Sequence, residues 1–96
     1  LRHIPMTEDG MLDLDAVPAL ITARTRVVAV THVSNVTGFV TPLERIVPLA
    51  RAVGALVVLD ACQAAPHLAL HPRALDVDVA VFSGHKLYGP TGIGVL

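Results

Sequence analysis

Ala55-Leu56-Val57-Val58-Leu59-Asp60 is the stretch that decides the fold, because five apolar residues run together without an alternating polar position and end on a carboxylate. Such a short run, rich in β-branched residues, predicts a strand that is buried on both faces. Val27–Val30 and Val77–Phe82 predict two more strands of the same kind. Strands with this pattern are typical of parallel sheets that are covered by helices.

Between the first two strands the sequence predicts a helix. Thr41-Pro42-Leu43-Glu44 has the pattern of a capping box with proline at the first helical position. Apolar residues then recur at helical spacing as far as Val53, and Gly54 is a natural end. Pro48 lies inside this helix and predicts a kink, because proline has no N–H to donate.

The other segments give shorter signals. Asp13 and Asp15 are both candidate N-caps for an early helix. We expect a short strand with a turn over Leu1–Gly10 and the capped helix over Ala16–Ala23. Later in the chain we expect a turn over Ala61–Pro66, an irregular or short helical crossover over His67–Asp76 and a glycine-rich turn over Tyr88–Gly94.

Strand, helix, strand, crossover and strand in this order predict an α/β fold with a mainly parallel sheet in three layers, α/β/α. In such sheets ligands bind beyond the carboxyl ends of the strands. Asn35, Asp60 and Lys86 each follow the carboxyl end of a predicted strand. We therefore expect a ligand site at that edge of the sheet.

Composition excludes several classes of function. The 96 residues are 53% hydrophobic and 16% charged, with a net charge of -1, which is too apolar for disorder and provides no basic surface for nucleic acid. No apolar run approaches the roughly 20 residues that a membrane span needs. The single cysteine fits a reducing compartment, so we expect a cytoplasmic location.

Three further motifs have simple explanations. The glycines between Gly89 and Gly94 match neither a P-loop nor a dinucleotide fingerprint, so a turn is favoured over a phosphate cradle. His67 and His71 are four residues apart, but prolines flank them and no third metal ligand is near, so we predict no metal site. Cys62 has no adjacent signature of a nucleophile and is interpreted as a small packing residue.

Lys86 is the only lysine among seven basic residues. Arginine stays protonated, whereas a deprotonated lysine amine can attack a carbonyl and form an imine. Asp60 ends the neighbouring strand, where a carboxylate is costly unless a cation pairs with it, either an arginine or a protonated pyridine nitrogen. An imine-forming lysine and a carboxylate at one sheet edge are the two protein groups that a pyridoxal phosphate site requires.

The same residues carry a resemblance to a known family. Three segments match in order and spacing, namely Thr31-His32-Val33-Ser34-Asn35 with Gly38, Asp60-x-x-Gln63-Ala64, and Phe82-Ser83-Gly84-His85-Lys86-Leu87-Tyr88-Gly89-Pro90-Thr91-Gly92-Ile93-Gly94. The chain resembles the cysteine desulfurase branch of the class V aminotransferases, which are fold-type I pyridoxal phosphate enzymes. Its Leu-Tyr-Gly-Pro-Thr segment is similar to the group II desulfurases.

The resemblance implies a role for each matching residue. Lys86 would form the covalent link to pyridoxal 5'-phosphate, and Asp60 would keep the pyridine nitrogen protonated. Gln63 would hydrogen-bond the phenolic oxygen of the ring, and Ser83 and His85 would bind the phosphate.

Two other residues of the matching segments complete this assignment. Asn35 would lie near the ring and the substrate carboxylate, whereas His32 would have a structural role. In the family the nucleophilic cysteine and the substrate-binding arginine lie outside the segment that this chain matches, so Cys62 does not resemble the nucleophile.

The resemblance also implies an activity. We expect residues 1–96 to be part of a single cofactor-binding large domain, incomplete at both ends and not autonomous in folding, of an enzyme that converts L-cysteine to L-alanine. We further expect a homodimer that passes persulfide sulfur to an acceptor protein, as in iron–sulfur cluster assembly. A selenocysteine lyase, another class V enzyme such as an epimerase or a kynureninase-like hydrolase, and an inactive truncated α/β fragment are the alternatives.

Overall fold

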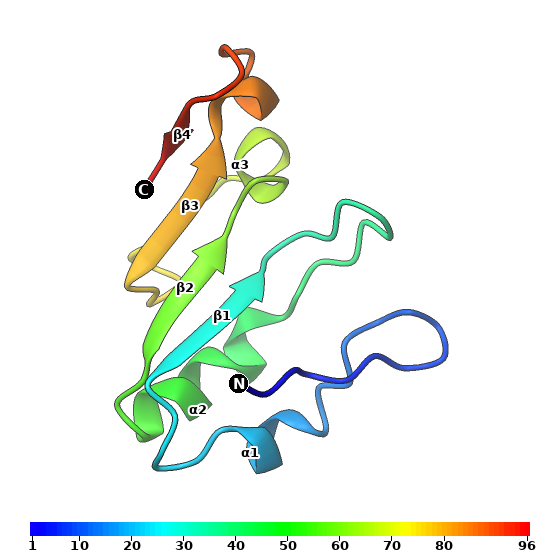
Figure 1. Ribbon diagram of the computed structural model, residues 1–96, viewed down its shortest axis with the longest axis vertical. Coiled ribbons are helices and arrows are strands. Elements are labelled where there is room, and N and C mark those ends of the chain that lie inside the picture. Colours follow the sequence, from blue (N-terminus) through cyan, green and yellow to red (C-terminus); the bar gives the residue numbers. More distant parts are fainter.

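The computed structural model describes all 96 residues, which form one four-stranded sheet with the strand order β1-β2-β3-β4 (Figure 1). β1 (Val27–Thr31), β2 (Leu56–Asp60) and β3 (Val79–Ser83) are parallel, and β4 (Gly94–Val95) pairs antiparallel with β3. The predicted α/β fold with a mainly parallel sheet is confirmed.

The register of the sheet brings the ends of the three parallel strands to one edge. Thr31 of β1 pairs with Asp60 of β2, and Asp60 pairs with Val81 of β3. The ladder continues past both strand ends, because the His32 N–H donates to the Asp60 carbonyl at 2.9 Å and the Ala61 N–H donates to the Val81 carbonyl at 2.8 Å. The loops that follow β1 and β2 therefore start side by side.

Short helices cover one face of the sheet. They are α1 (Val17–Leu20), the 3-10 turn η1 (Leu43–Arg45) and α2 (Val47–Ala52), whereas α3 (Ala64–His67) and the 3-10 turn η2 (Gly84–Leu87) follow the strand ends (Figure 1). The largest fully buried side chains are Ile46, Leu59, Val17 and Val57. Burial of each such aliphatic side chain contributes about 1.5–3 kcal/mol relative to exposure. None of the helices is long and apolar enough to cross a membrane.

β1 and β2 are buried on one face rather than on two, whereas β3 is half-buried along its whole length. Val28 and Val30 of β1 are buried, whereas their neighbours in the strand are exposed, and Val27 and Leu56 each retain 53% of their accessible surface. The apolar runs therefore predict the strands correctly but not their burial on both faces. The second face stays open because no helix of these 96 residues packs against it. A strand run without alternation indicates a sheet that is made to be covered on both sides.

The predicted long helix is two shorter ones. η1 ends at Arg45, and α2 begins at Val47 with Pro48 in its first turn, where a missing N–H costs nothing. The predicted kink is therefore a break in the helix. The predicted capping box is wrong, because no side chain caps η1 and the Thr41 hydroxyl donates instead to the Thr31 carbonyl at 2.6 Å. Gly54 ends this segment as predicted, with φ of 70°.

Other boundaries also differ from the prediction. The strand predicted within Leu1–Gly10 is only an isolated bridge between Met6 and Leu12, and the helix predicted over Ala16–Ala23 is limited to α1. The Asp13 carboxylate accepts from the N–H groups of Asp15 and Ala16 and so closes the turn before α1. Part of the turn predicted over residues 61–66 is helical, because α3 starts at Ala64.

Arg51 connects α2 to the segment before β3. Its guanidinium lies 2.8 Å from Asp78 and 3.1 Å from Asp76. The Asp78 carboxylate also accepts from the Val57 N–H at 2.7 Å, at the start of β2. The Val57 hydrogen bond and then the Arg51 contact hold the pKa of Asp78 below its ordinary value of 3.8, and the Asp78 and Asp76 carboxylates raise the pKa of Arg51.

We predict that Asp78→Asn destabilises the protein near neutral pH and that this effect vanishes in acid. A carboxyl whose pKa is lowered by folding stabilises the folded state above its unfolded pKa, and the contribution is lost as the pH falls through the folded pKa. The measurement is the thermal midpoint of wild type and variant from pH 7 to pH 3. A difference between the two proteins that stays constant over this range would contradict the assignment.

Candidate active site at the carboxyl ends of the strands

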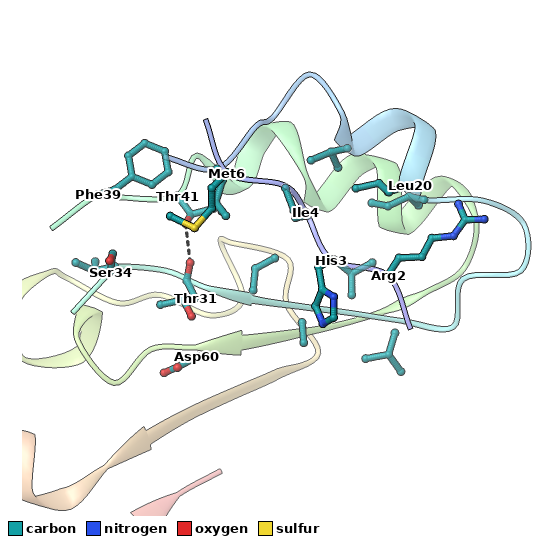
Figure 2. Close-up of a pocket in the computed structure, with 18 of the residues that line it drawn as sticks. Arg2, His3, Ile4, Met6, Leu20, Thr31, Ser34, Phe39, Thr41 and Asp60 are labelled. Atoms are coloured by element: carbon teal, nitrogen blue, oxygen red, sulfur yellow. Dashed lines mark hydrogen bonds between the residues drawn. The ribbon is translucent and has the colours of Figure 1, made fainter. Parts of the chain in front are cut away.

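A cavity of about 1030 Å³ runs along the open edge of β1 and reaches the carboxyl ends of the strands. The N-terminal segment Leu1–Met6 forms its far wall, and Figure 2 shows His3 reaching from that segment toward β1. Arg2 turns instead toward α1, where its guanidinium donates to the Ala19 carbonyl at 3.5 Å. Four residues that the sequence predicts for the site line the end of the cavity at the sheet edge, namely Asn35, Asp60, Gln63 and Lys86. Cys62 lines the same end. The structure therefore brings residues from three separate loops to one cavity.

Asp60 is held by the backbone that follows it. Its carboxylate accepts from the Cys62 N–H at 2.9 Å, which is the only hydrogen bond made to this side chain. No arginine pairs with it, because the ion pairs of the chain join Arg45 to Asp15 and Arg51 to Asp76 and Asp78. A half-buried carboxylate at the end of an apolar strand thus faces the cavity without an ion pair to the protein.

Asn35 and Gln63 meet at the same edge. The Gln63 side-chain amide donates to the Asn35 side-chain carbonyl, so the loop after β1 contacts the turn after β2. Asn35 lies near the tip of a hairpin that spans residues 32–41, which we name the Asn35 hairpin. Its base is a bridge between Val33 and Val40 and the hydrogen bond from the Thr41 N–H to the His32 carbonyl at 2.7 Å.

Lys86 lies on η2, immediately after β3. The turn is closed by two backbone bonds, from the Gly89 N–H to the Gly84 carbonyl at 2.9 Å and from the Gly84 N–H to the Ile93 carbonyl at 2.8 Å. Tyr88 ends η2 in the left-handed region with φ of 61°. A Cβ on Gly89 would lie 2.9 Å from the Gly84 carbonyl oxygen, so only glycine fits there without a shift. The glycine-rich segment is thus the turn between β3 and β4 that the sequence predicts.

The two residues that the resemblance assigns to a phosphate lie beside the cavity rather than in its wall. The Ser83 hydroxyl donates to the Cys62 sulfur at 3.5 Å, and His85 is exposed and makes no side-chain hydrogen bond. His32 is 9% exposed and its Nδ1 has no partner. Burial lowers the pKa of His32, which favours the neutral imidazole.

Sequence reasoning did not recognise two residues of this region. Cys62 is half-buried, lines the cavity and accepts from Ser83, so it is more than the packing residue that the sequence suggests. Thr41 is part of the hairpin base, although its position before Pro42 suggests a helix cap. The hydroxyl of Thr41 donates to the carbonyl of Thr31, which no strand pairs with. This contact depends on the hairpin that brings Thr41 back to β1, and the sequence pattern does not show that hairpin.

Comparison with known proteins agrees with this geometry. The family model described as aminotransferase class V matches residues 1–96. The chain belongs to the class V aminotransferase family. Within that family the chain is 57% identical over 96 residues to a cysteine desulfurase of Dickeya dadantii and 53% identical to one of Escherichia coli. Each match covers 100% of this chain, but only 23% of the first relative and 24% of the second.

Solved structures of cysteine desulfurases show the same fold. A crystal structure of a cysteine desulfurase from Escherichia coli superposes with a TM-score of 0.86 at 44% identity, over 95% of this chain and 23% of that one. The apo structure of a cysteine desulfurase from Thermococcus onnurineus gives a TM-score of 0.85 at 39% identity, over 98% of this chain and 24% of that one. The chain thus spans about a quarter of the length of these relatives.

We predict that Gly89→Ala destabilises this class V protein, because the added Cβ meets the Gly84 carbonyl oxygen, a backbone atom that cannot move alone. Overpacking of this kind costs about 1–3 kcal/mol. Gly94→Ala is the comparison, since its Cβ would meet the Phe82 carbonyl oxygen at 3.3 Å, a tight contact that needs a smaller shift. Thermal denaturation of wild type and both variants measures the cost, and a Gly89→Ala midpoint equal to that of wild type would show that the turn at Gly89 is not tight.

Proposed function

We propose that these residues form the cofactor-lysine segment of a pyridoxal phosphate-dependent cysteine desulfurase, which converts L-cysteine to L-alanine and passes persulfide sulfur to an acceptor. The observation that carries the proposal is the meeting of Lys86 and Asp60 on one cavity, with the Asn35–Gln63 pair beside them. The identity to cysteine desulfurases over the whole chain supports the choice of reaction.

The residues fit pyridoxal phosphate in their chemistry. Asp60 faces the cavity without an ion pair to the protein, and a protonated pyridine nitrogen would supply the missing partner. Lys86 would hold the cofactor covalently, because a lysine amine forms an imine and a guanidinium does not. Gln63 and Asn35 would contact the ring, and Ser83 and His85 would bind the phosphate at the start of η2.

When bound, pyridoxal phosphate supplies an electron sink for negative charge that develops at the substrate α-carbon. Asp60 would strengthen this effect by keeping a proton on the ring nitrogen. The amine of Lys86, when free, would move a proton at the α-carbon as a general base and acid. The Asn35 amide would orient the substrate carboxylate from the hairpin. Cys62 is left without a role in sulfur transfer.

The rest of the enzyme is part of the same proposal. We propose that residues 1–96 belong to one larger cofactor-binding domain of a cytoplasmic homodimer, which works with a sulfur-acceptor protein in iron–sulfur cluster assembly or another sulfur pathway. The relatives named here are cysteine desulfurases, so no observation favours a selenocysteine lyase, an epimerase or a kynureninase-like hydrolase. Experiments therefore use the longest reading frame that contains these residues.

We predict that Lys86→Arg folds and abolishes turnover. The substitution keeps the positive charge and removes the amine that can form an imine. Borohydride reduction followed by mass spectrometry should find a phosphopyridoxyl group on the peptide that contains Lys86 in wild type and none in the variant. Arg73→Lys, an exchange at an exposed position outside the cavity, is the control and should keep full activity. A reduced cofactor on another lysine would overturn the assignment.

We predict that Asp60→Ala loses turnover more than it loses cofactor. Lys86, Ser83 and His85 remain to hold the cofactor, but the ring nitrogen loses its proton and the electron sink weakens. A fall in kcat of at least about 100-fold corresponds to roughly 2.7 kcal/mol of transition-state stabilisation. Asp15→Ala, which removes an exposed carboxylate paired with Arg45, is the matched control. A yellow Asp60→Ala protein with wild-type turnover would show that Asp60 does not face the ring nitrogen.

A further inference from the structure

The Asn35 hairpin is fastened to the sheet at its base. The His32 N–H donates to the Asp60 carbonyl, and the His32 carbonyl accepts from the Thr41 N–H. Both contacts of His32 are made by its backbone, and its buried imidazole makes no hydrogen bond through Nδ1. The single side-chain hydrogen bond at the base comes from Thr41, whose hydroxyl donates to the Thr31 carbonyl at 2.6 Å.

The Thr31 carbonyl lies on the open side of β1. In a parallel strand the N–H and C=O groups of successive residues point alternately to the two neighbours. Because His32 bonds to β2, the peptide groups of Thr31 face away from β2, where no strand of this chain pairs with β1. Figure 2 shows the Thr41 hydroxyl reaching this carbonyl, with Asp60 at the end of the adjacent strand.

Thr41 is built into this position. It is 3% exposed, and it stands at the point where the hairpin ends and Pro42 begins the approach to η1. A buried hydroxyl with a short, well-placed acceptor fixes both ends of the hairpin against the end of β1. The tip of the hairpin has its own bonds, from the N–H groups of Val36 and Thr37 to the Ser34 hydroxyl, so its position relative to the sheet is set at the base.

We propose that Thr41 is a positioning residue that acts through Asn35, by fixing the Asn35 hairpin so that the Asn35 amide meets Gln63 at the cofactor edge. Thr41 touches neither substrate nor cofactor in this arrangement. The consequence for binding rests on the proposed function, because it assumes that Asn35 and Gln63 contact pyridoxal phosphate. The consequence for the hairpin rests on the hydrogen bonds alone.

Thr41→Val and Thr41→Ser separate the hydroxyl from the rest of the side chain. Valine keeps the shape and leaves the Thr31 carbonyl without its donor, whereas serine keeps the donor. Val47→Ala is the matched control, since it removes buried volume from α2 without touching the hairpin base. All variants are made in the longest reading frame that contains these residues, with and without a second substitution, Asn35→Ala.

Two measurements test the proposal. Amide hydrogen exchange of the apo protein should rise at least about tenfold at Ser34 and Thr41 in Thr41→Val, and stay within about threefold of wild type in Thr41→Ser and Val47→Ala. Titration with pyridoxal phosphate should show about tenfold weaker binding for Thr41→Val. In the Asn35→Ala background the same substitution should add less than about twofold, because its effect passes through Asn35.

Different results would contradict the positioning role of Thr41 and the proposed function of the site. Unchanged exchange in Thr41→Val, equal loss in Thr41→Ser, or a binding loss that adds fully to Asn35→Ala would each overturn the positioning role. A wild-type protein that binds no pyridoxal phosphate would overturn the proposed function. The exchange data would then still decide whether the Thr41 hydroxyl fixes the hairpin.

Discussion

The structure depends on the parallel register in which Thr31, Asp60 and Val81 lie side by side. Because backbone hydrogen bonds fix this register, the three strands end together, and the loops that carry Asn35, Gln63 and Lys86 leave the sheet at one edge. A shift of one residue in β2 would turn Asp60 to the other face of the sheet. The positions of the site residues therefore depend first on the backbone hydrogen bonds between the strands.

The charged residues are divided between the two ends of the strands. Arg51 and Asp78 connect α2 to the start of β2 and to the residues before β3, which is the amino end of the sheet. Asp60 stands at the carboxyl end with no such partner. The ion pairs thus stabilise the fold away from the cavity and leave one carboxylate free to meet a ligand. A salt bridge to Asp60 would have made the site more stable and chemically inert.

The sequence predicts the strands and the site edge well, because both follow from local patterns. Apolar runs and the polar residues after them locate β1, β2 and β3 and place Asp60 and Lys86 at the same edge. The helix caps fail for a tertiary reason: Thr41 has the pattern of an N-cap, but the open carbonyl of Thr31 takes its hydroxyl. Burial on both faces fails because the covering of a sheet depends on distant segments, which a strand pattern does not contain.

The antiparallel pairing of β3 with β4 makes the lysine turn the most local part of the sheet. Phe82 pairs with Val95 and Ser83 with Gly94, so the ends of this hairpin are near in sequence and meet quickly. The pairing of β1 with β2 spans the whole Asn35 hairpin and α2, and contacts of such sequence separation are in general slower to form. The turn around Lys86 is thus closed by the most local strand pairing of the sheet, whereas the edge that carries Asp60 depends on long-range pairing.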